Sequence, residues 1–151
     1  MTISTEDCAQ VILDVTPLIM RVIRMEMRSN RSPDLTVPQF RTLIFIRNHP
    51  HASLTDVADH LGLTLSSTSK MVDGLVKRLL VERSDSPQDR RRMTLKLTGQ
   101  GNASLDQAIQ CTLNRVSSAL VQISETERAG IVKTMQLLNQ VFAVELSDPS
   151  K

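Results

Sequence analysis

Apolar residues recur at spacings of three and four along most of the chain, a periodicity that predicts a mostly helical protein. The first stripe lies between residues 8 and 22. Within it, Thr16-Pro17 predicts a kink or a restart, because a threonine cap followed by proline suits a helix start. The polar segment 30–34 is expected to be a loop, and a second helix is expected over 37–47, ended by His49-Pro-His51.

Residues 53–79 contain two short apolar stripes separated by a glycine. Ser53 is a good N-cap with Asp56 in the first turn, and Gly62 is expected to end that helix. Thr64 is expected to cap the next helix, which we predict to run to about Leu79. Two short helices joined by a tight turn with glycine predict a helix-turn-helix.

Alternating apolar and polar residues then predict two short strands, 80–83 and 93–97. The segment between them, 84–92, is too rich in Arg, Asp and Pro for a core and is expected to be an exposed hairpin tip. A hairpin directly after a helix-turn-helix predicts a wing. From about residue 102 to 147 we expect two further helices, the second starting at the capping box Ser124-Glu-Thr-Glu127.

Length and composition limit the class of protein. The 151 residues fit one domain, 1–151, and 40% hydrophobic with 23% charged residues excludes disordered chains and disulfide scaffolds. No apolar run reaches the ~20 residues of a membrane span, and no secretory signal is visible. With two cysteines 103 positions apart, we expect a cytoplasmic protein with reduced thiols and no membrane contact.

The positive charge is concentrated in the middle of the chain. Residues 36–101 carry ten basic and six acidic residues, whereas 1–35 and 102–151 each carry four basic and five acidic ones. This distribution favours a polyanionic partner for the middle segment.

The second helix of the predicted helix-turn-helix and the hairpin tip carry groups that suit DNA. Small polar and basic side chains match the donors and acceptors of a major groove, and guanidinium groups on a narrow hairpin match the negative potential of a minor groove. The candidate DNA-binding residues are Thr64, Ser66, Ser67, Ser69, Lys70, Lys77, Arg78, Asp89, Arg90 and Arg91. Asp89 is expected to pair with a neighbouring arginine. The alternatives are a solvated helix start and a tip that only keeps an edge soluble.

The run Asp89-x-Arg91-x-x-x-Leu95-x-x-Thr98-x-x-Gly101 resembles the signature of the MarR family of winged-helix regulators. Four flanking segments also resemble that family: Leu-Thr-Val-Pro-Gln-Phe40, Ala58-Asp-His-Leu-Gly62, Ser66-Ser-Thr-Ser-Lys70 and Leu80-Val-Glu-Arg83. The resemblance covers roughly residues 10–145. It implies a mostly α fold, in which 36–101 form a winged helix-turn-helix lobe with a small β-hairpin wing, and 1–35 and 102–151 form dimerisation helices.

The resemblance also implies a homodimer with the recognition helix 64–79 in the major groove and Arg91 in the minor groove. The long amphipathic helices outside the lobe support a dimer independently, because they must bury their apolar stripes. One position departs from the family pattern, since Leu79 stands where glycine is usual. Leucine does not take a left-handed cap cheaply, so we expect the helix to end differently or to run on slightly.

The sequence therefore predicts a sequence-specific regulator of transcription, a repressor on a pseudopalindromic operator in double-stranded DNA. The resemblance implies release by a small molecule, often an aromatic acid, which enters between the dimer helices and the DNA-binding lobes. The candidate contacts for it are Arg21, Arg24, Phe40 and Ile44.

Two alternatives stay open. Cys8 or Cys111 would make a redox-responsive regulator, although the chain lacks the tyrosines that hold the oxidised thiol in such relatives. A winged-helix module without DNA binding would act on proteins, which the basic tip argues against. No nucleophile–base pair, phosphate loop or cofactor motif is present, so we predict neither an enzyme nor a cofactor. The spacing of His49, His51 and His60 fits no metal site.

Overall fold

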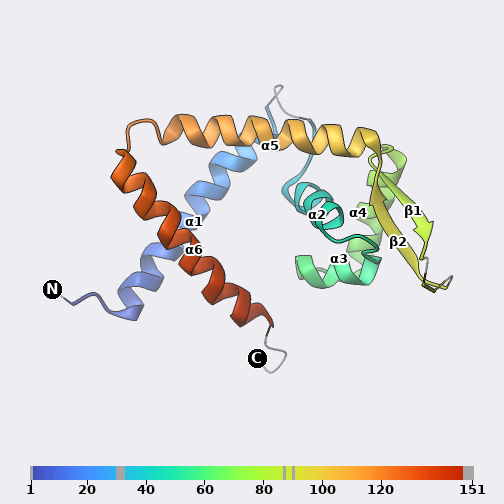
Figure 1. Cartoon of the computed structure of the whole chain (residues 1–151), viewed down its shortest axis with the longest axis horizontal. Coiled ribbons are helices and arrows are strands. Elements are labelled where there is room, and N and C mark those ends of the chain that lie inside the picture. Colours follow the sequence, from blue (N-terminus) through green and yellow to red (C-terminus); the bar gives the residue numbers. More distant parts are fainter. Residues whose placement is uncertain (1, 30–32, 87, 90, 148–151) are drawn as a thin grey trace. The chain divides into compact units, whose positions relative to one another are not determined.

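The computed structural model describes residues 2–29, 33–86, 88–89 and 91–147, the side chain of Ser147 excepted (Figure 1). The elements follow the predicted order and confirm a mostly α fold with a small hairpin. They are α1 (Thr5–Met27), α2 (Val37–Asn48), α3 (Leu54–Leu61), α4 (Leu65–Lys77), β1 (Val81–Asp85), β2 (Met93–Leu97), α5 (Gly99–Ala119) and α6 (Glu125–Ser147). The chain divides into two compact units, residues 1–115 and 116–151. The prediction that 1–151 form one domain stays a prediction.

Side-chain caps start the helices where the sequence places them. The hydroxyls of Ser53, Thr64 and Ser124 each accept a hydrogen bond from the backbone N–H three residues later, at 3.2, 3.1 and 3.3 Å. At the other end of α3, Gly62 takes the predicted left-handed conformation with φ of 67°. The helix-turn-helix is thus set by local chemistry that satisfies the backbone groups at the helix ends.

Of the two outcomes predicted for Thr16-Pro17, the restart of the helix is wrong and the kink stays a prediction. α1 is one helix with Pro17 inside it. The hydroxyl of Thr16 donates to the carbonyl of Ile12 at 2.7 Å, so it is used within the helix and does not cap a new one. The capping box of Ser4 and Asp7 starts the whole helix. Pro17 has no N–H to donate, and the helix continues past it without that one backbone hydrogen bond.

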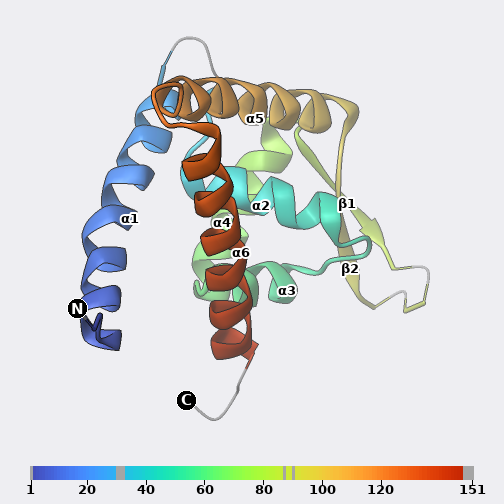
Figure 2. The same ribbon diagram turned by 60° about the vertical axis from the view of Figure 1, so that its left-hand side comes forward.

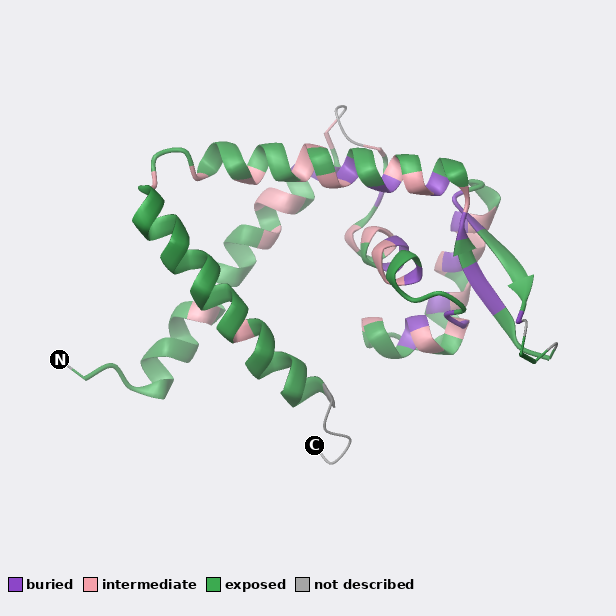
Figure 3. Ribbon diagram, viewed as in Figure 1, coloured by how far each residue is buried: buried purple, intermediate pink, exposed green. Residues whose placement is uncertain are grey.

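The hydrophobic core lies within the first unit, between α2, α3, α4, the hairpin and the first half of α5. Figure 3 shows the buried positions, in purple, gathered on these elements. The largest fully buried apolar side chains are Met27, Leu43, Val57, Val72, Leu75, Val81 and Leu105. Among the described residues of α6, none is buried. The core therefore belongs to the lobe that carries the helix-turn-helix.

β1 and β2 pair antiparallel, with Val81 opposite Leu97 and Asp85 opposite Met93, and β2 leads directly into the start of α5 (Figure 2). Leu95 and Leu97 are buried on one face, as predicted. Thr94 is also buried, on the other face, where its hydroxyl lies 3.1 Å from that of Ser84. β1 extends two residues beyond the predicted strand.

The end of α4 differs from the prediction. α4 stops at Lys77, and Leu79 adopts a left-handed conformation with φ of 59°. The N–H groups of Leu79 and Leu80 donate to the carbonyls of Val76 and Leu75, both at 3.0 Å, which is the Schellman pattern. The leucine takes the strained conformation because Leu80, next to it, is buried in the core and the carbonyl of Leu79 accepts from the Thr98 hydroxyl at 2.5 Å.

Replacing Leu79 by glycine is expected to stabilise the lobe by about 1 kcal/mol, because a left-handed residue with a Cβ costs ~1–2 kcal/mol and the Leu79 side chain, 65% exposed, loses little packing. Urea denaturation at fixed protein concentration measures the change. Leu79→Ala is the matched control, since it removes the same side chain and keeps the Cβ. Equal stability of the Gly and Ala variants would show that the turn stores no strain.

Candidate nucleic-acid interface

The recognition helix α4 has one face in the core and the opposite face in solvent. Thr68, Val72 and Leu75 are buried, whereas Ser66 and Lys70 are exposed and Ser69 is half-buried. Lys77 and Arg78 are also exposed, and neither they nor Lys70 form an ion pair within the described part of the chain. The predicted DNA-facing residues of α4 are therefore polar or basic, and all of them except the half-buried Ser69 are exposed.

Thr64 and Ser67 form a local pair at the first turn of α4. The Thr64 hydroxyl accepts from the Ser67 N–H at 3.1 Å and donates to the Ser67 hydroxyl oxygen at 3.0 Å. Thr64 is thus occupied as a cap. Ser67 receives a hydrogen bond at its oxygen and keeps its own proton to donate.

The hairpin tip is shaped by Asp89 and Ser86. The Asp89 carboxylate accepts from the backbone N–H of Arg91 at 2.9 Å, and the backbone carbonyl of Asp89 accepts from the backbone N–H of Arg92 at 3.0 Å. The Ser86 hydroxyl accepts from the N–H groups of Gln88 and Asp89 at 3.3 and 3.4 Å. Asp89 therefore fixes the backbone of the tip. Arg90 lies outside the described residues, so the predicted pairing of Asp89 with a guanidinium stays a prediction.

Arg91 and Arg92, at the tip, make different contacts. The Arg91 side chain is exposed and forms no ion pair among the described residues. Arg92 instead reaches back to α3, where its Nη2 lies 2.7 Å from Asp56 Oδ2 and 3.1 Å from Ser53 Oγ. This anchor ties the wing to the cap of α3. Sequence reading missed it, because no local signal joins residues 36 positions apart.

A second ion pair ties the wing to the recognition helix. Nη2 of Arg83, on β1, contacts Oδ1 of Asp73, on α4. This contact was not predicted either. Arg83 and Arg92 form ion pairs that hold the wing against α4 and α3, whereas Arg91 forms none within the described part of the tip.

The ionised form of Asp56 stabilises this junction. Its pKa is lowered from 3.8, first by the hydrogen bond from the Ser53 backbone, opposed by burial, and further by the Ser53 hydroxyl and Arg92. Because the pKa is lower in the folded chain, the charged carboxylate contributes stability above about pH 4 and loses it as the pH falls further.

Replacing Asp56 by asparagine is accordingly expected to cost less than about 1 kcal/mol at pH 7, since the ion pair is half exposed. The difference from the parent chain should close as the pH falls below about 4. Denaturation at pH 7, 5 and 3 tests this, with Asp59→Asn, on the exposed side of the same helix, as the charge-matched control. A gap that is as large at pH 3 as at pH 7 would rule out the charge as its source.

The remaining signature residues have structural roles. Leu95 is in the core. The Thr98 hydroxyl accepts from the Gly101 N–H at 2.9 Å, so Thr98 caps α5 while it also holds the Leu79 carbonyl. Gly101 packs directly on the backbone of Leu80. Much of the signature therefore builds the joint between α4, the hairpin and α5.

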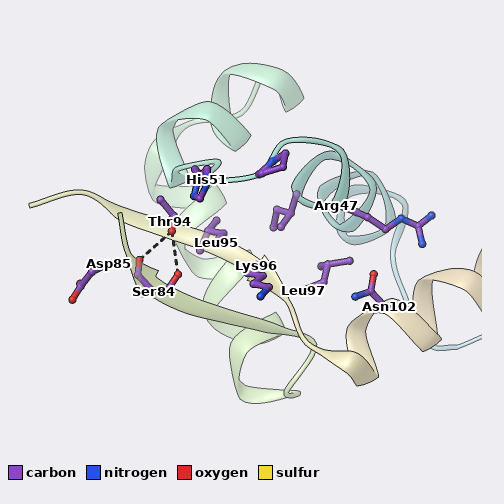
Figure 4. Close-up of a pocket in the computed structure, with 11 residues that line it drawn as sticks. Arg47, His51, Ser84, Asp85, Thr94, Leu95, Lys96, Leu97 and Asn102 are labelled. Carbon is purple, nitrogen blue, oxygen red and sulfur yellow. Dashed lines mark hydrogen bonds between the residues drawn. The ribbon is translucent and has the colours of Figure 1, made fainter. Parts of the chain in front are cut away.

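The four candidate effector contacts lie on α1 and α2. Arg21 and Arg24 are exposed, whereas Phe40 and Ile44 are half-buried and pack against the core. A hollow of about 470 Å³ lies elsewhere, along the edge of β2 near the end of α2. Figure 4 shows Arg47 and Asn102 at one end of it and Asp85 at the other. None of the four candidates lines this hollow.

The rings of His49 and His60 stack on Phe45, with centroids 4.1 and 4.3 Å from it. The pKa of His60 is lowered, chiefly by burial and then by Arg41 and His49. Cys8 is exposed. Across the described ranges, no three His, Cys, Asp or Glu residues gather as metal ligands, and no helix there is both long and apolar enough to cross a membrane.

Comparison with known proteins agrees with this geometry. The MarR family model matches residues 34–92. The transcriptional repressor NicR of Pseudomonas putida is 31% identical over 100 residues, which are 66% of this chain and 63% of NicR, so the match spans less than two thirds of that relative. The crystal structure of RV1404 from Mycobacterium tuberculosis has a TM-score of 0.77 at 26% identity and covers 93% of this chain and 95% of its own.

Streptococcus pneumoniae FabT, solved in complex with DNA, shares the fold with a TM-score of 0.73 at 21% identity, over 93% of this chain and 98% of FabT. The family model covers the helix-turn-helix and most of the wing, which are the elements whose caps, turn and anchors are described above. Residues 34–92 are therefore similar to the MarR family, and the chain has the fold of a winged helix-turn-helix protein.

Proposed function

We propose that this protein binds a pseudopalindromic operator in double-stranded DNA as a homodimer and represses transcription. The observation that carries this proposal is the pairing of an exposed polar and basic face on α4 with an exposed arginine on the adjacent wing. FabT, with the same fold, binds DNA, and NicR is a repressor. We propose no enzymatic activity, and we place the protein in the cytoplasm.

The residues divide by the part of the duplex that they would contact. Lys70, Lys77 and Arg78 bind phosphates and set the register, whereas Ser66, Ser67 and Ser69 lie against base edges in the major groove. Arg91 enters the minor groove, with Arg90 beside it in the chain. Asp89 shapes the tip, and Thr64 acts through the cap that it forms.

Exposed apolar side chains on α1 and α6 support the homodimer. Val11, Leu13 and Leu18 on α1 are each at least 60% exposed in the single chain. α6 likewise exposes Val132, Met135, Leu137, Val141, Phe142, Val144 and Leu146. Surfaces of this kind are normally covered by a partner, and pairing of two copies presents two recognition helices about one helical turn of DNA apart.

The repressor is released by a small-molecule effector, which we propose to be an organic anion such as an aromatic acid. Arg21 and Arg24 offer exposed cations for a carboxylate, and Phe40 and Ile44 offer apolar surface. This part of the proposal rests on the family and on these residue types.

Fluorescence anisotropy with the upstream DNA of its own gene tests the function. Full-length protein is titrated against that duplex and a scrambled one at 50 and 200 mM salt. We expect preference for the upstream duplex and a loss of affinity of ~10³-fold or more at the higher salt, because several phosphates are neutralised. No binding to either duplex at low salt would favour a protein-interaction module instead.

A further inference from the structure

Leu65 is an exposed leucine on the surface that is proposed to face DNA. It is the first residue of α4, between the cap Thr64 and Ser66, and it is 52% exposed. A single exposed leucine is ordinary on most surfaces. At this position, however, the neighbours are small polar residues that suit hydrogen bonding, and Leu65 has no group that donates or accepts.

Because the Leu65 side chain is apolar, it can make a favourable contact only with an apolar group in the major groove. Of the groups that base pairs present there, only the C5-methyl of thymine is apolar. Side chains of a helix lean toward its N-terminus, so a residue in the first turn extends beyond the helix body toward the groove floor. A leucine there would increase the affinity for DNA by burying the C5-methyl group of a thymine, and it cannot bind a phosphate.

Ser67 supplies a second, polar reading group in the same turn. Because its oxygen accepts from the Thr64 hydroxyl at 3.0 Å, its own hydroxyl proton remains available to donate. The Thr64 hydroxyl is held in turn by the Ser67 N–H at 3.1 Å. A hydroxyl donor whose oxygen is held in place suits the N7 acceptor that both purines present in the major groove.

We propose that the first turn of α4 determines operator specificity through these two residues. Leu65 contacts the C5-methyl of a thymine, and Ser67 donates to N7 of a purine in a neighbouring base pair, with Thr64 as its positioning residue. The inference rests on the proposed function, in which α4 enters the major groove.

Base analogues test each contact separately. A duplex is selected from a random pool with the full-length protein, and each thymine of one half-site is then replaced by uracil, which lacks only the methyl. We expect one position at which uracil weakens binding about three- to fivefold, the value of one buried methyl group. Because a homodimer carries the substitution in both half-sites, Leu65→Ala should weaken binding to the parent duplex by about ten- to 25-fold, and it should show no further loss with uracil.

Leu63→Ala is the matched control, because Leu63 is 41% exposed and lies two residues away, outside the helix. It should keep the full sensitivity to uracil. A Leu65→Ala variant that is as sensitive as the parent protein would overturn the thymine contact. Equal loss of sensitivity in both variants would overturn its assignment to Leu65.

Purines with carbon in place of N7 test Ser67 in the same way. We expect one 7-deazapurine to weaken binding by about two- to tenfold, the value of one hydrogen bond. Ser67→Ala should be insensitive to it, Thr64→Val should lose most of the sensitivity, and Thr64→Ser should retain it. Unchanged sensitivity in Ser67→Ala would overturn the donor role.

The selection step separates the two proposals. If no duplex is enriched, the proposed sequence-specific DNA binding is wrong, and the inference on Leu65 and Ser67 is wrong as well. If a duplex is enriched and bound in a salt-sensitive manner, but the variants respond to the analogues as the parent does, the proposed function stands and only the roles of Leu65 and Ser67 are wrong.

Discussion

Gly101→Ala is expected to destabilise the DNA-binding lobe by about 3 kcal/mol, at the upper end of the usual cost of overpacking. A Cβ at Gly101 would overlap the carbonyl oxygen of Leu80 and lie 2.9 Å from its carbonyl carbon and 3.2 Å from its Cα. These are backbone atoms, which cannot rotate away as a side chain does. The same carbonyl accepts from the N–H of Thr98 at 3.1 Å, so moving it weakens a second contact. Urea denaturation followed by circular dichroism measures the loss.

Gly74→Ala separates this steric effect from the general effect of alanine in a helix. Gly74 lies inside α4, and a Cβ there meets nothing within 4 Å. The change should stabilise by ~0.5–1 kcal/mol, because alanine loses less backbone entropy than glycine. If Gly101→Ala proved as stable as the parent protein, the close approach of α5 to Leu80 would be wrong.

The helix-turn-helix could be predicted because its determinants are local. Ser53, Gly62 and Thr64 each act within four residues of their own position, as caps or as a left-handed turn. The same holds for the capping box at Ser124. A sequence displays such determinants directly, since the residues that interact are neighbours in the chain.

The end of α4 could not be predicted because distant residues decide it. The local preference of Leu79 is against a left-handed turn. The Thr98 hydroxyl, 19 positions later, binds the Leu79 carbonyl, and Leu80 is buried in the core. Where these contacts outweigh a cost of ~1–2 kcal/mol, local propensity gives the wrong answer.

The residue types of the candidate interface could be predicted from the sequence, but the ion pairs that position its wing could not. The sequence marks three consecutive arginines at the wing as one basic cluster. The structure assigns Arg92 to Asp56 in α3, and Arg83 to Asp73 in α4. Ion pairs over such separations depend on the tertiary fold, and opposite charges in a sequence are too common to identify them.

Arg91→Ala is expected to weaken binding to all DNA sequences by about 1–3 kcal/mol while the homodimer remains intact. Arg91 is exposed, and in the described chain its side chain holds nothing together. In the proposed complex it contacts the minor groove and the phosphates, which are features of every duplex. Because each dimer loses two cations, the slope of log affinity against log salt should become shallower by about two.

Arg92→Ala distinguishes a DNA contact from a wing anchor. It removes the same side chain one position away, but that side chain is bound to Asp56 Oδ2 at 2.7 Å and to Ser53 Oγ at 3.1 Å. We therefore expect it to lower thermal stability slightly and to loosen the wing, while the salt slope stays near that of the parent protein. Anisotropy titrations at several salt concentrations, with light scattering to verify the dimer, measure both variants. If Arg91→Ala left the slope unchanged and Arg92→Ala reduced it, the roles of the two arginines would be reversed, and the cation that enters the groove would be Arg92.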